Sequence, residues 1–302
     1  MTKTWVIVIG AMICCTLWGS AFPCIKIGYR LLEIAAADTA SQILYAGYRF
    51  TLAGVLTVVL GSILQRKILL PKRSAIGKIG LLSLLQTVLQ YLFFYIGLAH
   101  TTGVKASIIE AVSTFVAILV AGYLFHQETV TSRKMLGCLI GFAGVVLVNV
   151  AGSGMDFHFS PAGDGCILLW TVAYAFSSVC MKRFSQKEDP VMLSGYQFIL
   201  GGIVMIACGG AMGGHLKAFT ASAAALLIYM AMISAVAYSL WGMLLKYNPV
   251  SKVTVFGFMN PVIGVILSAL LLNETESLGV SSVLALGLVC VGIYIVNAKA
   301  KE

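Results

Sequence analysis

Two ionisable side chains lie inside long apolar segments of this 302-residue chain, where an isolated charge is costly and usually has a function. Glu110 lies about two helical turns into the apolar run 103–125, and Arg49 lies about eight residues into the run 41–64. A carboxylate in apolar surroundings can exchange a proton or bind an amine, and a guanidinium can bind a carboxylate through two hydrogen bonds. The two residues therefore predict a polar site inside a largely apolar molecule.

Both charges also have structural interpretations, which the sequence leaves open. Glu110 could form a fixed ion pair with Arg49, Lys26 or Lys105, although Lys105 lies five residues away, a poor spacing for a pair on one helix. Arg49 could instead extend toward the membrane surface or hold two helices together through a salt bridge. The small and polar residues at helical spacing from Glu110, among them Ser113, favour an inward-facing carboxylate.

Four aromatic and amide residues near the middle of their apolar segments are predicted to line the same site. Indole and amide groups orient a bound solute through a few hydrogen bonds. The four are Trp18, Gln90, Trp241 and Asn260. Gln86, Tyr91, Tyr95, Trp170, Tyr174, Ser177 and Tyr238 form a second group at membrane depth. Taken one at a time, these residues are explained more simply by helix packing or by an interfacial aromatic belt.

The segments that must position these residues have the composition of a membrane protein. Hydrophobic residues make up 60% of the chain and charged residues 10%, with a mean hydropathy of +0.97, whereas soluble domains are about half apolar and a quarter charged. Ten segments have the roughly 20 apolar residues that a membrane span needs. They are 5–29, 41–64, 76–98, 103–125, 134–151, 163–182, 191–212, 221–244, 251–272 and 279–297. We therefore expect an all-α integral membrane protein with ten transmembrane helices.

Basic residues are distributed unevenly over the connections between these segments. With a cytoplasmic N-terminus, 15 of the 20 lysines and arginines fall on the cytoplasmic side. These are Lys3, Arg66, Lys67, Lys72, Arg73, Lys78, Arg133, Lys134, Lys182, Arg183, Lys187, Lys246, Lys252, Lys299 and Lys301. The bias predicts a multi-pass protein of the cytoplasmic membrane with both termini in the cytoplasm. The net charge of +9 then faces anionic membrane lipid, and no nucleic-acid partner is expected.

The sequence contains no motif for enzymatic or metal chemistry. None of the eight cysteines forms a CxxC pair, and no histidine lies at metal-ligand spacing from them. There is no phosphate-binding loop, no HExxH motif and no nucleophile elbow. The first segment continues past Pro23, longer than the usual core of a signal peptide, so we expect an uncleaved first span. We expect no metal, no cofactor and no enzymatic activity.

The chain contains an internal repeat. The stretch GYRFTLAGV at 47–55 returns as GYQFILGGI at 195–203, which places Gln197 opposite Arg49. Aligning 90–128 with 236–274 without gaps pairs Glu128 with Glu274. Two repeats of five spans each, residues 1–151 and 161–298, must enter the membrane in opposite directions because five is odd. This is the inverted-repeat plan of secondary transporters, whose solute site lies near the membrane midplane between the halves.

Several stretches resemble a known family. LWGSAFPCIKIG at 17–28, YRFTLAG at 48–54 and LVAGYLFHQETVTSRKMLGCLIGFAGVVLVN at 119–149 are similar to a first EamA-type repeat, and 258–297 is similar to the second. The chain thus resembles EamA-domain transporters of the drug/metabolite transporter superfamily. The resemblance implies ten helices in two inverted halves, a central cavity, and movement, usually export, of amino acids or other small polar metabolites. The family's usual proline in the fourth span is Phe115 here, its counterpart Pro261 is present, and Glu110 is not part of the family pattern.

Together these observations predict a secondary transporter that works by alternating access. Its partners would be a small-molecule solute, membrane lipid and a proton exchanged at Glu110. Arg49 and Glu110 would suit a zwitterion such as an amino acid if both face one cavity. An uncoupled facilitator or exchanger is one alternative. A non-transporting membrane scaffold is another, because the GxxxG spacing of Gly137 and Gly141 suits close helix packing or a homodimer contact.

Overall fold

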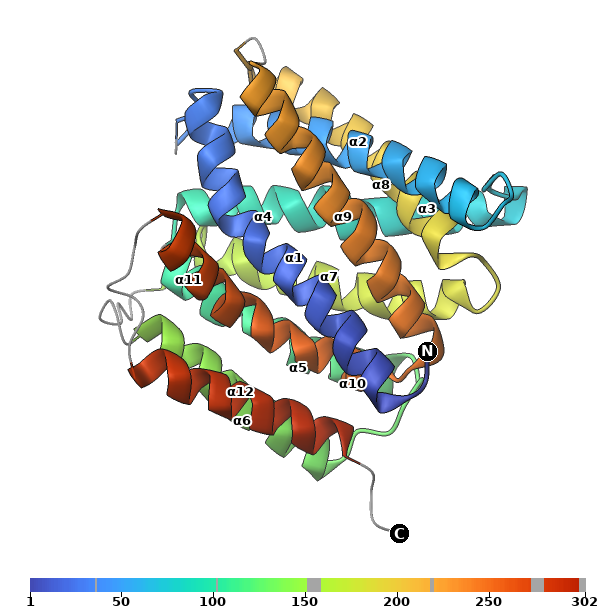
Figure 1. The fold of residues 1–302 in the computed structure, drawn as a ribbon, viewed down its shortest axis with the longest axis vertical. Helices are drawn as coiled ribbons and strands as arrows, with labels where there is room; N and C mark the ends of the chain where they lie inside the picture. Colours follow the sequence, from blue (N-terminus) through green and yellow to red (C-terminus); the bar gives the residue numbers. More distant parts are fainter. Residues whose placement is uncertain (36, 102, 151–158, 218–219, 273–279, 299–302) are drawn as a thin grey trace.

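Every regular element that the structure describes is a helix, as expected for long apolar segments that must satisfy their backbone hydrogen bonds internally. The computed structural model describes the chain except residues 36, 102, 151–158, 218–219, 273–279 and 299–302 (Figure 1). The α-helices are α1 (Thr4–Leu31), α2 (Thr39–Leu64), α3 (Arg73–Leu82), α4 (Gln90–Ala99), α5 (Gly103–Leu119), α6 (Ser132–Val150), α7 (Asp164–Ser185), α8 (Pro190–Ala211), α9 (Ala221–Tyr247), α10 (Val250–Thr254), α11 (Met259–Leu272) and α12 (Val280–Asn297). The repeat partner of Glu128, Glu274, lies outside the described residues.

Three of the predicted spans are not single regular helices. The stretch 73–99 is continuous but contains a π-helical segment, η1 (Ser83–Leu89), between α3 and α4. A second π-helical segment, η2 (Val120–Leu124), follows α5, and a 3₁₀ segment, η3 (Val255–Phe258), joins α10 to α11. Hydropathy predicts a span but not these changes of helical pitch, which depend on how neighbouring helices pack.

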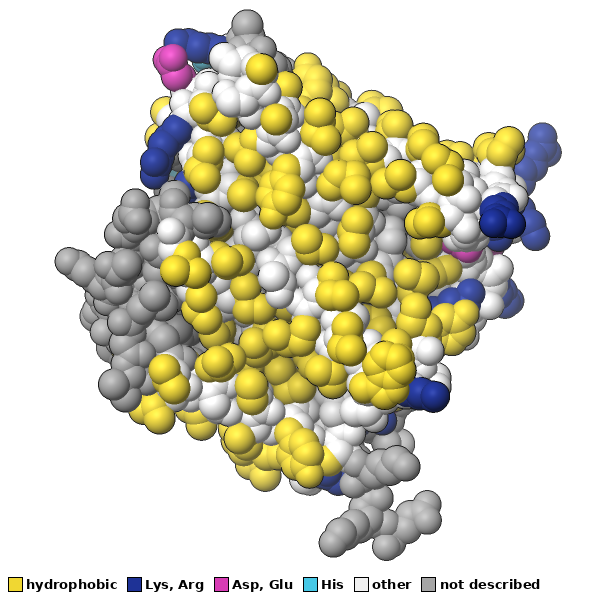
Figure 2. All heavy atoms as spheres, viewed as in Figure 1, with side chains coloured by type: hydrophobic (Ala, Val, Ile, Leu, Met, Phe, Trp, Pro, Cys, Tyr) yellow, Lys and Arg dark blue, Asp and Glu magenta, His cyan; other side chains and the backbone are white. Residues whose placement is uncertain are grey.

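Within the described residues, seven helices are long and apolar enough to cross a membrane. They are Thr4–Leu31, Thr39–Leu64, Arg73–Ala99, Lys105–Leu124, Asp164–Ser185, Pro190–Ala211 and Ala221–Tyr247. Figure 2 shows apolar side chains spread across one face of the bundle. Large apolar side chains such as Ile63 and Val283 are exposed. An apolar outer surface of this size is expected where lipid surrounds the helices. The chain is therefore an all-helical, multi-pass membrane protein.

The N-terminus and the last turn of α12 lie at the same end of the bundle, which we call the termini end. The Asn248 amide donates to the Met1 carbonyl, at 3.2 Å, so the connection after α9 lies beside the N-terminus. The connection before α6 reaches the same end, because Glu128 accepts a hydrogen bond from the Ser251 amide. Arg133, at the start of α6, donates to the Ile295 carbonyl in the last turn of α12, at 3.1 Å. In Figure 2, lysines and arginines gather on the side where Figure 1 marks the N-terminus.

Helices of the first half pack on helices of the second half throughout the bundle. In Figure 1, α2 lies beside α8 along one edge and α6 lies beside α12 along the opposite edge. Between them, α1 packs on α9 and α11, while α7 packs on α4 and α5. The first predicted span of each half therefore packs on the third and fourth predicted spans of the other half.

Glycines allow the closest of these crossings. A Cβ atom added to Gly54 would lie 2.5 Å from the carbonyl oxygen of Gly195, and one added to Gly202 would lie 2.9 Å from that of Gly47. Helices α6 and α12 meet in the same reciprocal way. A Cβ added to Gly144 would lie 2.7 Å from Ala285 O, and one added to Gly292 would lie 2.5 Å from Gly137 O. Backbones that meet so closely leave no room for side chains.

Candidate functional site

A cavity of about 100 Å³ lies in the centre of the bundle. Its walls come from α1, α2, α4, α5, α7, α9, η3 and α11, so both halves of the chain contribute. The lining residues are Trp18, Ala21, Ile25, Arg49, Gln90, Tyr91, Phe94, Tyr95, Glu110, Ala111, Ser113, Thr114, Trp170, Tyr174, Tyr238, Gly257, Asn260 and Pro261. Pockets for drug-sized ligands occupy about 300–1,000 Å³. The cavity therefore has room for a small solute or a few water molecules in this conformation.

Five of the six residues predicted to form the site line this cavity. They are Trp18, Arg49, Gln90, Glu110 and Asn260. The sixth, Trp241, lies behind the wall: its side chain is buried, and its ring meets that of Trp18 edge to face, with centroids 5.0 Å apart. Trp241 supports the position of Trp18 and does not itself face the cavity.

Arg49 is held in place by its neighbours but keeps part of its hydrogen-bonding capacity. Its Nη2 donates to the Ser234 hydroxyl on α9, at 3.0 Å, and its guanidinium lies 5.0 Å from the centre of the Phe50 ring. The side chain is buried, yet its Nε has no hydrogen-bond partner among the described residues. A buried guanidinium with a free donor is suited to bind an anionic group such as a carboxylate.

Glu110 faces the cavity from α5 and forms no ion pair with any residue that the structure describes. Lys105, on the same helix, lies 3.8 Å from Asp164 instead. Across the part of the chain that the structure describes, no ion pair joins Glu110 to Arg49, Lys26 or Lys105. The fixed ion pair considered from the sequence is therefore not formed in this conformation, and the carboxylate is available to a proton or to a cationic group of a solute.

Seven aromatic side chains form most of the remaining wall: Trp18, Tyr91, Phe94, Tyr95, Trp170, Tyr174 and Tyr238. The hydroxyls of Tyr91 and Tyr238 share a hydrogen bond of 2.8 Å. The rings of Trp170 and Tyr174 are stacked, with centroids 5.7 Å apart. Trp18 was one of the four residues first predicted to line the site, and the tyrosines and Trp170 stood in the second group of sequence candidates. Phe94 carried no polar signal that separates it from ordinary packing.

Several polar atoms of the cavity residues have no partner within the described chain. Besides Arg49 Nε, they are Trp18 Nε1, Gln90 Oε1 and Asn260 Oδ1, all buried. Buried polar groups in native proteins are rarely left without a hydrogen bond. These atoms include both donors and acceptors, so a polar solute or water in the cavity could satisfy them together.

Interruptions in regular helix coincide with the cavity. The π-helical segment η1 ends immediately before Gln90 and Tyr91, and the 3₁₀ segment η3 contains Gly257 and precedes Asn260. Pro261, which also lines the cavity, lacks the amide hydrogen that a regular helix would use. Such local changes of pitch redirect side chains and often occur at functional sites.

The model of the EamA-like transporter family matches residues 5–150 and again residues 161–298. An uncharacterized transporter of Archaeoglobus fulgidus is 28% identical over 98% of this chain and 99% of its own length. The uncharacterized transporter YvbV of Bacillus subtilis is 26% identical, over 94% of this chain and 89% of its own.

A third relative, the uncharacterized inner membrane transporter YedA of Escherichia coli K12, is 28% identical over 94% of this chain and 90% of its own length. One solved crystal structure shares the fold, with a TM-score of 0.79, 16% sequence identity, and coverage of 98% of this chain and 97% of that chain. At this level of identity the structural likeness concerns the fold alone.

Proposed function

Because the chain belongs to the EamA-like transporter family, it is a membrane transporter, and we propose that it exports a small polar metabolite such as an amino acid. The observation that carries this proposal is that Arg49 and Glu110 line one central cavity, with Glu110 unpaired among the described residues. A zwitterion carries the two charges that would complement them.

The proposed mechanism is alternating access by two inverted five-helix repeats, residues 1–151 and 161–298, that together make ten spans. Two observations support this arrangement. The family model matches the chain twice, with nearly the same boundaries. The contacts of Gly54 with Gly195 and of Gly202 with Gly47 are those expected of a two-fold axis in the membrane plane.

Proton coupling is proposed to occur at Glu110. The carboxyl group of Glu110 is neutral when it holds a proton and can bind a cationic solute when it is charged, so solute and proton would compete for it. Rocking of the two halves would then expose the cavity to opposite sides with either ligand bound. This exchange would couple solute export to the inward movement of protons.

The glycines whose spacing suggested a scaffold or a homodimer pack against other residues of the same chain. A Cβ atom added to Gly137 would lie 2.9 Å from Gly292 O, and one added to Gly141 would lie 2.6 Å from the Phe258 ring. These contacts favour an intramolecular role for Gly137 and Gly141. We therefore do not include a second copy of the chain in the proposed mechanism.

The proposal is tested by reconstituting the protein into proteoliposomes and measuring the movement of a panel of amino acids and related metabolites, with and without an imposed pH gradient. We expect accumulation of a zwitterion to follow the gradient. The Glu110→Gln variant should retain its fold but reduce accumulation to equilibration, because an amide cannot exchange a proton. Glu33→Gln is a matched control, since Glu33 pairs with Lys217 on the exposed surface.

Each other outcome selects a different function. Equilibration that is indifferent to the pH gradient, and unchanged in Glu110→Gln, would indicate an uncoupled facilitator or exchanger. Uphill transport that persists in Glu110→Gln would exclude this residue as the coupling group.

A further inference from the structure

The central cavity is closed toward the termini end by tightly packed residues. On α1, the lining residues Trp18 and Ile25 lie in the half of the helix away from the N-terminus, and Trp170 lies near the distant start of α7. Between the cavity and the termini end, Cys14 and Leu244 are completely buried in the largest hydrophobic cluster. Among the described residues, packed side chains therefore separate the cavity from the termini end in this conformation.

Two buried polar atoms interrupt this packed region. The side chains of Ser178 and Trp241 are almost completely buried beside the Tyr174 hydroxyl, and neither Ser178 Oγ nor Trp241 Nε1 makes a hydrogen bond of regular geometry within the described chain. Along α7, Tyr174, Ser178 and Lys182 follow one another at helical spacing, from the cavity to the termini end. Buried polar groups without a regular hydrogen bond are rare in a permanently dry core, and they are expected where water enters in another conformation.

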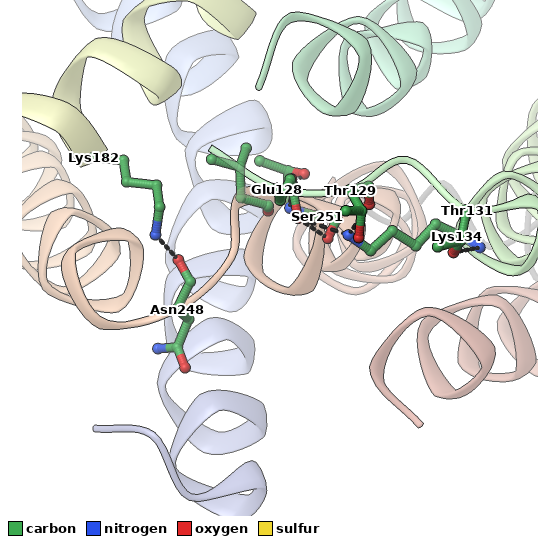
Figure 3. A network of polar contacts seen from close by, with 9 residues as sticks. Glu128, Thr129, Thr131, Lys134, Lys182, Asn248 and Ser251 are labelled. Carbon is green, nitrogen blue, oxygen red and sulfur yellow. Dashed lines mark hydrogen bonds and ion pairs between the residues drawn. The ribbon is translucent and has the colours of Figure 1, made fainter. Parts of the chain in front are cut away.

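A polar latch holds the two halves together at the termini end (Figure 3). The Glu128 carboxylate, in the connection between η2 and α6, accepts hydrogen bonds from the Ser251 amide at 2.9 Å and from the Ser251 hydroxyl at 2.5 Å. Lys134 donates to the same carboxylate, at 2.9 Å. Glu128 belongs to the first half and Ser251, at the start of α10, to the second. We call the contact between Glu128 and Ser251 the Glu128 latch.

A second set of contacts joins α7 to the segment that carries the latch. Lys182 donates to the backbone carbonyls of Leu245, at 3.2 Å, and of Asn248, and Figure 3 shows it close to the latch residues. The side chain of Asn248 in turn caps the end of α9 through the Leu244 carbonyl, at 2.9 Å. These contacts therefore fix the end of α7 to the end of α9 and to the connection that leads into α10. They lie between Ser178 and the termini end.

We propose that the inner half of the solute pathway runs between α7 and α9, past Ser178 and Trp241, and that the Glu128 latch keeps it closed. The inference rests on the proposed transport function, because it assumes a second conformation in which the cavity opens to the termini end. The latch consists of charge-assisted hydrogen bonds on a nearly buried carboxylate, so its release requires replacement partners for Glu128. Water or a solute entering the pathway provides such partners.

Thiol labelling of Ser178→Cys tests this pathway without any transport assay. The full-length protein is placed in sealed vesicles, and a membrane-impermeant maleimide is applied to each face in turn. Labelling is assigned to residue 178 by fragmenting its peptide in the mass spectrometer, which separates it from the native Cys180 two residues away. We expect slow labelling from the termini face with the latch intact. Adding Glu128→Gln or Ser251→Ala should raise the rate by about tenfold, as the closed state loses a charge-assisted hydrogen bond.

The controls separate failure of the latch from failure of the transport function. Glu33→Gln makes the same chemical change at an exposed ion pair and should leave the labelling rate unchanged. Folding of each variant is judged by size-exclusion chromatography in detergent. If Glu128→Gln does not fold, Ser251→Ala replaces it as the latch variant, because it removes only one hydroxyl. Unchanged labelling in a folded latch variant, or fast labelling with the latch intact, would overturn the proposal even if the protein transports solute. Latch-dependent labelling would support it even if no solute in the panel is moved.

Discussion

At the scale of single residues, the two charges in the cavity differ in how firmly they are held. Arg49 is fixed by Ser234 and by the Phe50 ring, and only its Nε remains free. Glu110 has no ion-pair partner among the described residues, so its charge depends on what enters the cavity. A rigid cation and an adaptable carboxylate are suited to different tasks: the first orients a solute, and the second responds to it.

Arg49→Gln should weaken binding of a solute that carries a carboxylate. Glutamine occurs at the repeat-related position, where Gln197 is completely buried and accepts a hydrogen bond from Thr87, at 2.6 Å, so the helix interface tolerates this side chain. A hydrogen bond to a charged group contributes about 1.5–3 kcal/mol, which corresponds to a KM raised about tenfold or more. The measurement is solute flux in proteoliposomes at increasing concentration.

The matched control for Arg49 is Ser234→Ala, which removes the partner of Nη2 but keeps the guanidinium. We expect its KM to rise less than that of Arg49→Gln. Equal KM values for the parent protein and Arg49→Gln would assign Arg49 a purely structural role.

At the scale of helices, the structure depends on close backbone crossings that only glycine permits. The crossing of α2 on α8 places Gly54 directly against the Gly195 carbonyl and the Ile199 amide, where any side chain meets backbone. Backbone atoms cannot rotate away as a flexible side chain can. The helices would have to separate to admit even one methyl group.

Gly54→Ala is therefore expected to destabilise the protein by about 1–3 kcal/mol, the usual cost of overpacking a well-packed interface. The midpoint of thermal unfolding in detergent should fall accordingly. Gly210→Ala, on α8, is the matched control, because no atom lies within 4 Å of an added Cβ there. Its higher helix propensity should leave the midpoint unchanged or raised. Equal effects of the two substitutions would contradict a specific role for the crossing.

The start of α2 depends on a capping carboxylate. Asp38 accepts a hydrogen bond from the Ser41 amide, at 3.0 Å, and hydrogen bonding from Ser41 lowers the pKa of Asp38 below its ordinary value. A lowered pKa in the folded state means that the stabilisation is fully present above the unfolded-state pKa, about 3.9, and is lost as the pH falls through the lower folded value.

We expect Asp38→Ala to cost about 0.5–2 kcal/mol at neutral pH, measured by thermal unfolding in detergent. The difference from the parent protein should shrink below about pH 4, where the parent's carboxylate becomes protonated. Asp38→Asn keeps a capping oxygen without a titrating group, so its contribution should not change with pH. A difference between Asp38→Ala and the parent that is constant with pH would exclude the carboxylate as the cap.

At the scale of the whole molecule, the two halves meet around the cavity and share the termini end. Contacts of Met1 with Asn248 and of Arg133 with Ile295 place the N-terminus and the last turn of α12 on one side of the bundle. The sequence assigns most basic residues to the helix ends and connections of that side. The distribution predicts that this side is cytoplasmic.

Epitope tags at the N-terminus and the C-terminus should therefore both be accessible from the cytoplasmic face. In sealed inside-out membrane vesicles, an added protease should remove both tags, and in right-side-out vesicles both should be protected. Removal of only one tag in either preparation would show that the number of spans is odd. Removal of both from right-side-out vesicles would reverse the predicted orientation.

The sequence by itself determined the features that depend on local composition. Apolar length and charge placement identified a multi-pass helical membrane protein, and repeated stretches such as GYRFTLAGV and GYQFILGGI indicated two related halves. The motifs at 119–149 and 258–297 identified the family that the whole-chain match supports. Charged and polar residues in apolar spans stood out as candidates, because an isolated polar group is costly there whatever the fold.

Only the tertiary structure decided which of these candidates meet. Trp18, Glu110 and Asn260 are far apart in sequence and share one cavity, whereas Trp241, with similar signals, packs behind Trp18. In the structure Lys105 forms an ion pair with Asp164, and Glu110 has no ion pair in the described chain. The physical reason is that the face each helix presents is set by non-local crossings, such as the glycine contacts of α2 with α8. Local composition constrains these crossings only weakly.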